Sequence, residues 1–209
     1  MEKLDEQLEL DLRAYHAAGT SLAFYLLHKR FTYVTTNHIG EVVCRDDKHR
    51  KILKKRRIPS ERELKLIKRE VIIYLAGPIA AGIHFGRLDY EDTRDFLVLK
   101  SQLNEKERWI DESLWRLDFD ETKLLIYRPC NWHAIDALAD ELKRKEKIRY
   151  KEARKTITEA IEDYNKAVSS GEVTVDQDYL DFVKRVEEKK ARMREAIRAI
   201  HLKIMGRRR

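Results

Sequence analysis

The chain has 209 residues, of which 39% are charged and 43% hydrophobic. The charged share exceeds the quarter that is typical of globular domains, yet the apolar share suffices for a packed core and excludes a disordered chain. Seven Gly and three Pro leave too few turns for a sandwich or barrel of many strands, so we expect a mainly helical fold. Two Cys cannot form a disulfide scaffold, and a cytoplasmic location is the default expectation.

The charge is unevenly distributed, and no segment predicts a membrane span. The longest apolar stretch, Val71–Phe85, is shorter than the ~18 residues that a span requires. The acidic, polar start Met1–Leu12 does not resemble a signal peptide. Residues 141–209 hold 20 basic and 13 acidic side chains, which accounts for the whole net charge of +7. The run Lys48–Arg57 contains no acid and suits an acidic partner, although solvated loops also have this composition.

The first half of the chain predicts a helix, a hairpin and a second helix. Apolar residues recur every three or four positions from about Asp5 to His28, which is typical of a helix. Phe31–Thr36 and Glu41–Arg45 are rich in β-branched and aromatic residues, and the Gly between them favours a β-hairpin. Ser60 begins a capping-box pattern for a helix that continues to Phe85, with a kink or close packing expected at Gly77-Pro78.

The second half predicts helices alone. They are expected at Asp89–Gln102, Glu105–Tyr127 (as one helix or two), Trp132–Lys145, Tyr150–Val168 and Asp176–Met205. Asn131 is the expected N-cap of the third of these, and Ser169-Ser170-Gly171 is expected to separate the last two. The last helix carries an apolar stripe, which must pack on the bundle or pair with another chain.

Several segments, in this order, resemble the peptidase domain of FtsH-type zinc proteases, and most closely its stand-alone relatives without an ATPase. The segments are AYHAAGTSLAFYLL, the hairpin, LAGPIAAGIHFG, an Asp-led helix and NWHAIDALADEL, and they cover about residues 10–165. In that family the first segment reads A-Y-H-E-A-G-H-A and binds zinc, the glycine-containing segment packs behind the metal, and the Asp supplies the third ligand. The resemblance implies a zincin-like helical bundle over residues 1–168, with 172–209 outside it as a C-terminal amphipathic helix and basic tail.

The resemblance is degenerate at the positions that carry the chemistry. An H-E-x-x-H hydrolase needs two His on one helix face, a Glu that acts as the base and a third ligand. Here His16 keeps the first ligand position, Ala17 occupies the general-base position and Thr20 occupies the second ligand position. Asp89 matches the third ligand best, and Asp92 is the next candidate. The resemblance therefore implies a vestigial metal site at His16, Thr20 and Asp89, with no intact catalytic residue and no expected cofactor.

These observations predict a catalytically inactive metallopeptidase-like protein that binds a protein partner, either at a sheet edge or through self-association or docking by residues 172–209. Two alternatives remain open. A divergent zinc metallopeptidase would use His16, Asp89 and an unrecognised ligand, and would retain zinc after purification. A basic structural subunit of a larger assembly would co-purify with nucleic acid, although no known nucleic-acid-binding module supports that reading.

Overall fold

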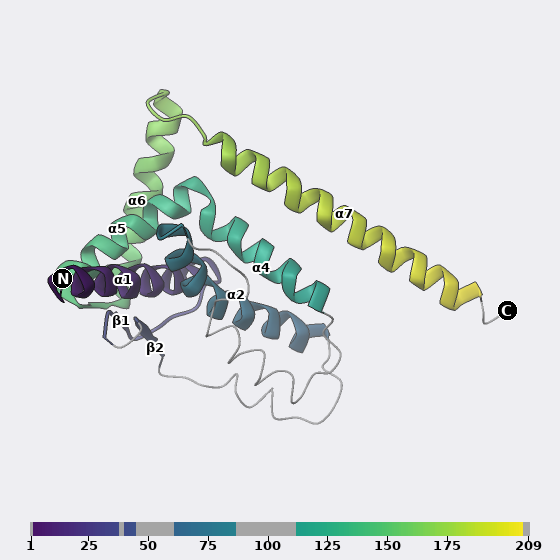
Figure 1. Ribbon diagram of the computed structural model, residues 1–209, viewed down its shortest axis with the longest axis horizontal. Coiled ribbons are helices and arrows are strands. Elements are labelled where there is room, and N and C mark those ends of the chain that lie inside the picture. Colours follow the sequence, from purple (N-terminus) through teal and green to yellow (C-terminus); the bar gives the residue numbers. More distant parts are fainter. Residues whose placement is uncertain (1, 38–39, 45–60, 87–111, 207–209) are drawn as a thin grey trace. The chain divides into compact units, whose positions relative to one another are not determined.

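The computed structural model describes residues 2–37, 40–44, 61–86 and 112–206 (Figure 1). Its helices are α1 (Glu2–Leu26), α2 (Glu61–His84), α4 (Glu112–Tyr127), α5 (Pro129–Lys145), α6 (Tyr150–Ser170) and α7 (Gln177–Gly206). Its strands are β1 (Tyr33–Thr35), β2 (Glu41–Val43) and β3 (Lys147–Arg149). The expectation of a mainly α protein with a small hairpin is confirmed. No helix in these ranges is long and apolar enough to cross a bilayer.

The chain divides into two compact units, residues 1–174 and 175–209. The first contains the bundle and the sheet. The second contains α7, which begins with a capping contact in which Asp178 N donates to Asp176 Oδ1 at 2.9 Å. Figure 1 shows α7 as one unbroken helix, and its bounds agree closely with the predicted Asp176–Met205.

The core of the first unit surrounds α1, which packs against α2 and α5, while α6 packs on α5 and α4 on α2. The largest fully buried apolar side chains come from all of these elements: Leu22, Val34, Leu75, Ile79, Ile126, Ile135, Leu138, Leu142, Ile148 and Ile157. Each such burial contributes about 1.5–3 kcal/mol. Tyr15, Leu22, Leu75 and Ile135, the positions around which the sequence predicts helix packing, are all buried.

Helices α1 and α2 cross at very close range because small residues lie at the crossing. A Cβ atom added to Gly19 of α1 would lie 2.5 Å from Ala80 Cβ and 2.6 Å from the Ala76 carbonyl oxygen of α2. Helix α2 runs unbroken from Glu61 to His84 with Pro78 inside it. The close packing expected at Gly77-Pro78 is observed, since a Cβ atom added to Gly77 would meet Thr20 and His16 of α1.

The sheet has the antiparallel order β2-β1-β3. In β1, Tyr33 lies opposite Val43 of β2 and Arg149 of β3. Val34 of β1 and Ile148 of β3 are fully buried partners, so this face of the sheet belongs to the core. The sequence predicts a hairpin or a three-stranded edge, and the structure has three strands. The position of β3 was not predicted, because three residues between two helices carry no alternating pattern of useful length.

The ends of two helices test the predicted caps. Asn131 is not the N-cap of α5, because the helix begins at Pro129 and Arg128 is its cap residue. Proline suits the first helical position, since the N–H that it lacks would be unsatisfied there in any case. The side chain of Asn131 instead donates from Nδ2 to the Leu125 carbonyl at 2.6 Å, near the end of α4. The break after α6 is confirmed, with Gly171 as a left-handed C-cap at φ +78°.

Candidate functional site

Two of the residues predicted for the vestigial metal site lie on the face of α1 that meets α2. A Cβ atom added to Gly77 of α2 would lie 2.5 Å from Thr20 Oγ1 and 2.9 Å from both Cε1 and Nε2 of His16. The spacing of four residues therefore brings His16 and Thr20 together, as predicted. Both side chains face the backbone of a neighbouring helix.

His16 also joins α1 to the hairpin. Its Nδ1 lies 3.0 Å from the Gly40 carbonyl oxygen, and because a carbonyl can only accept, Nδ1 is the donor. Gly40 has φ +82°, and a Cβ atom there would collide with the Arg13 carbonyl of α1. Only glycine both adopts this conformation readily and permits this approach. The turn of the hairpin is thus held directly on α1, with the His16 ring as its side-chain anchor.

Of the remaining predicted site residues, only Ala17 lies in the described part of the chain. Ala17 is fully buried, and its methyl group has no acid–base chemistry. Asp89, its runner-up Asp92 and the basic run Lys48–Arg57 lie outside the described residues.

The described donors do not fit a zinc ion. The Thr20 hydroxyl donates to the His16 carbonyl oxygen of its own helix at 3.0 Å. A neutral hydroxyl is a poor ligand for zinc, and the predicted third ligand, Asp89, lies outside the described residues. Over residues 2–37, 40–44, 61–86 and 112–206, no three His, Cys, Asp or Glu side chains are grouped for a metal.

A second cluster, centred on Tyr15, joins α1, α2 and α5. The Tyr15 ring stacks on His84 of α2, with centroids 3.6 Å apart, and lies 5.9 Å from Trp132 of α5. Its hydroxyl donates to Asp136 Oδ1 at 3.0 Å. The sequence placed Tyr15 in the core but missed its partners. The available signal was the spacing of Trp132 and Asp136, which puts both on one face of α5.

Burial and charge perturb the titration of this cluster. Burial, followed by the nearby Asp136 carboxylate, raises the pKa of Tyr15 far above its ordinary value. Burial also raises the pKa of Asp136, although the Tyr15 hydrogen bond opposes the shift. Burial disfavours the charge of Lys143, but the Asp140 and Asp11 carboxylates outweigh it and raise the pKa of this ammonium. Tyr15 therefore keeps its proton at neutral pH and acts as a hydrogen-bond donor that ties α1 to α5.

Lys143 forms one ion pair within α5 and one ion pair with α1. Its Nζ lies 2.8 Å from Asp140 Oδ1 and 3.2 Å from Asp11 Oδ1. Asp11 Oδ1 is buried and has no hydrogen-bond partner in the described part of the chain. The ion pair between Lys143 and Asp11 adds to the link between α1 and α5.

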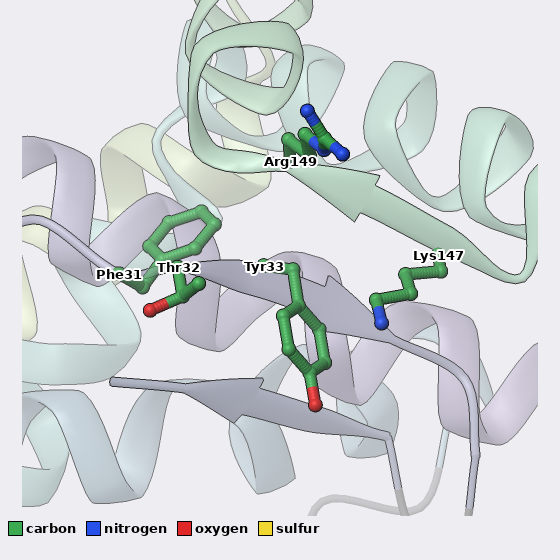
Figure 2. Close-up of a pocket in the computed structure, with 5 residues that line it drawn as sticks. All are labelled: Phe31, Thr32, Tyr33, Lys147 and Arg149. Atoms are coloured by element: carbon green, nitrogen blue, oxygen red, sulfur yellow. The ribbon is translucent and has the colours of Figure 1, made fainter. Parts of the chain in front are cut away.

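A pocket of about 550 Å³ lies on the sheet, away from both clusters (Figure 2). Its lining comes from two segments that are distant in sequence: Phe31, Thr32, Tyr33, Lys147 and Arg149. Lys147 Nζ lies 3.8 Å from the centroid of the Tyr33 ring, which is a cation–π contact. The sequence could not indicate this pocket because the position of β3, which supplies both cations, was not predicted.

The fold defines a class: a helical bundle that carries a three-stranded antiparallel sheet. Compared with known proteins, the chain matches no family model, and no curated protein sequence matches it either. The resemblance to FtsH-type peptidases therefore rests on the segments quoted above.

Proposed function

We propose that this protein is a catalytically inactive, FtsH-peptidase-like module that binds a protein partner. The observation that carries the proposal is the use of the motif residues. His16 anchors the hairpin through Gly40, the Thr20 hydroxyl bonds its own helix, and both side chains abut Gly77. With alanine at position 17, the motif lacks the carboxylate that would take a proton from a metal-bound water. The segment thus has a packing role where the resembled family has a chemical one.

Partner binding is supported by the surface of the sheet. In the order β2-β1-β3, the strands β2 and β3 each pair on one side only among the described residues. Strands at such positions accept an extended segment of another chain through backbone hydrogen bonds. The strands β2 and β3 could therefore bind a peptide even though the catalytic residues of the resembled enzymes are replaced.

Metal analysis tests the inactive reading. Protein purified without chelator should hold far less than one zinc per chain, and its thermal midpoint should not change with EDTA. A matched variant, His16→Ala, should leave the zinc content unaltered. The proposal is overturned if the wild type holds about one zinc per chain that this variant loses, or if it hydrolyses an unfolded protein in a zinc-dependent manner.

Restoring the motif tests the alignment. Ala17→Glu with Thr20→His would place H-E-x-x-H on one face of α1. We expect this double variant to gain zinc affinity before any peptidase activity, because activity also needs supporting residues and a substrate groove. Adding His16→Ala should abolish the gain. If the double variant binds no more zinc than the wild type, either Asp89 is misassigned as the third ligand or α1 does not face the former site.

A further inference from the structure

The outward face of the sheet carries the cations of the pocket. Successive side chains of a strand point to opposite faces, and Val34 and Ile148 point into the core. Tyr33, Lys147 and Arg149 therefore share the opposite face, with Tyr33 directly across from Arg149. Both cations are exposed. Phe31 and Tyr33 supply the aromatic part of the lining.

These two cations differ from Lys145 in charge pairing. Lys145, just before β3, forms ion pairs with Glu141 and Glu152. Neither Lys147 nor Arg149 forms an ion pair with any carboxylate in residues 2–37, 40–44, 61–86 and 112–206. Glu41 is the acid of β2 on this face, and Thr35 of β1 separates it from Lys147. The pocket therefore presents positive charge that the described residues do not neutralise.

The placement of Lys147 and Arg149 favours two separate carboxylates over a single phosphate. In Figure 2 the Lys147 side chain ends beside Tyr33, whereas Arg149 points away from it. A single phosphate would need both groups to converge. The two cations are attached to Cα atoms about 6.6 Å apart, and their side chains diverge from there. Two separate carboxylates on an extended peptide match this arrangement.

We propose that the pocket formed by Phe31, Thr32, Tyr33, Lys147 and Arg149 binds an extended acidic segment of a partner protein. Carboxylates at alternate positions of that segment pair with Lys147 and Arg149, and its apolar groups pack on the partly exposed Tyr33 ring. This inference rests on the proposed partner-binding function and specifies the chemistry of the partner.

The test uses the full chain and labelled octapeptides in fluorescence anisotropy. One peptide alternates Glu and Val, a second has the same composition with its Glu residues adjacent, and a third replaces Glu by Gln. We expect the alternating peptide to bind most tightly and to weaken with salt. Lys147→Gln and Arg149→Gln should each weaken it about two- to fivefold, and together about tenfold, as expected for exposed ion pairs. The control variants Lys151→Gln and Arg154→Gln remove exposed cations of α6 and should leave affinity unchanged.

Several results would overturn the inference. These are absence of binding, equal affinity for the alternating and adjacent peptides, equal losses in the control variants, and displacement of the peptide by an equimolar amount of inorganic phosphate. Thermal unfolding of each variant confirms that the fold is intact. The zinc and peptidase assays decide the proposed inactivity separately, so failure of the pocket is distinguishable from failure of the proposed function.

Discussion

Gly77→Ala probes the crossing of α1 and α2 where the degenerate motif lies. Alanine is favoured over glycine inside a helix by about 1 kcal/mol. Against this gain, the new Cβ would lie 2.5 Å from Thr20 Oγ1 and 2.9 Å from two His16 ring atoms. Neither neighbour yields easily, because Thr20 is hydrogen-bonded to its own helix and His16 to Gly40. Overpacking of this kind costs about 1–3 kcal/mol, which leaves a net loss of up to about 2 kcal/mol.

Thermal unfolding followed by circular dichroism measures this loss. A loss of 1 kcal/mol lowers the midpoint by about 2–4 °C in a unit of this size, so we expect a decrease of up to about 8 °C. Thr20→Ala removes the closest contact, and in the Gly77→Ala background it should restore part of the stability, with a coupling of at least about 0.5 kcal/mol. A rise of the midpoint in Gly77→Ala alone, or strict additivity of the two changes, would show that His16 and Thr20 do not abut α2.

Three further predictions concern the Tyr15 cluster and α7. Tyr15→Phe leaves the Asp136 carboxylate without its donor and should cost about 1–2 kcal/mol in urea unfolding at pH 7; Tyr150→Phe, whose hydroxyl has no hydrogen bond within the described residues, should cost little, and equal losses would contradict the assigned role. The folded-state pKa of Asp136 lies above its ordinary 3.8, so its contribution to stability is complete below pH 3.8 and is lost as pH rises through the folded-state pKa. Asp136→Asn should therefore reduce the fall in the free energy of unfolding from pH 4 to pH 7. If the dependence of that free energy on pH is unchanged, the burial of Asp136 is contradicted. Truncation after Thr174, the end of the first unit, should leave that unit folded. Because α7 carries an apolar stripe, the truncation should also reduce any self-association measured by light scattering. If the truncated and full chains have the same number of subunits in solution, α7 is not the means of association.

Local patterns predicted most of the fold. The helical periodicity of α1, α5, α6 and α7 and the hairpin around Gly40 were all readable, because each depends on residues close in sequence. The capping of α5 was misread because Asn131 is a strong cap by type, whereas Pro129 sets the start of the helix. Strand β3 exists only because β1 offers it a pairing partner, and its own three residues are too few to specify a strand.

The candidate site, like the fold, was predictable only where it depends on residues close in sequence. The spacing of His16 and Thr20 placed both on one helix face, since that relation is set by the helical repeat. The packing of His16 and Thr20 against Gly77 and the bond from His16 to Gly40 depend on how the helices and the hairpin pack, which no local pattern encodes. The Tyr15–Asp136 hydrogen bond joins residues 121 positions apart, and its partners could be identified only in three dimensions.

The pairing of β1 with β3 has a consequence for the order of folding. Glu146, just before β3, accepts a hydrogen bond from Thr36, 110 residues earlier in the chain. Closing so long a loop costs entropy before any strand contact repays it, so the central strand acquires its second neighbour only after the intervening helices have brought the two segments together. The β1–β2 hairpin can form early from local contacts, whereas β3 completes the sheet late. In refolding followed by pulsed hydrogen exchange, the amide of Val43, which lies opposite Tyr33 in the hairpin, should gain protection before that of Ile148.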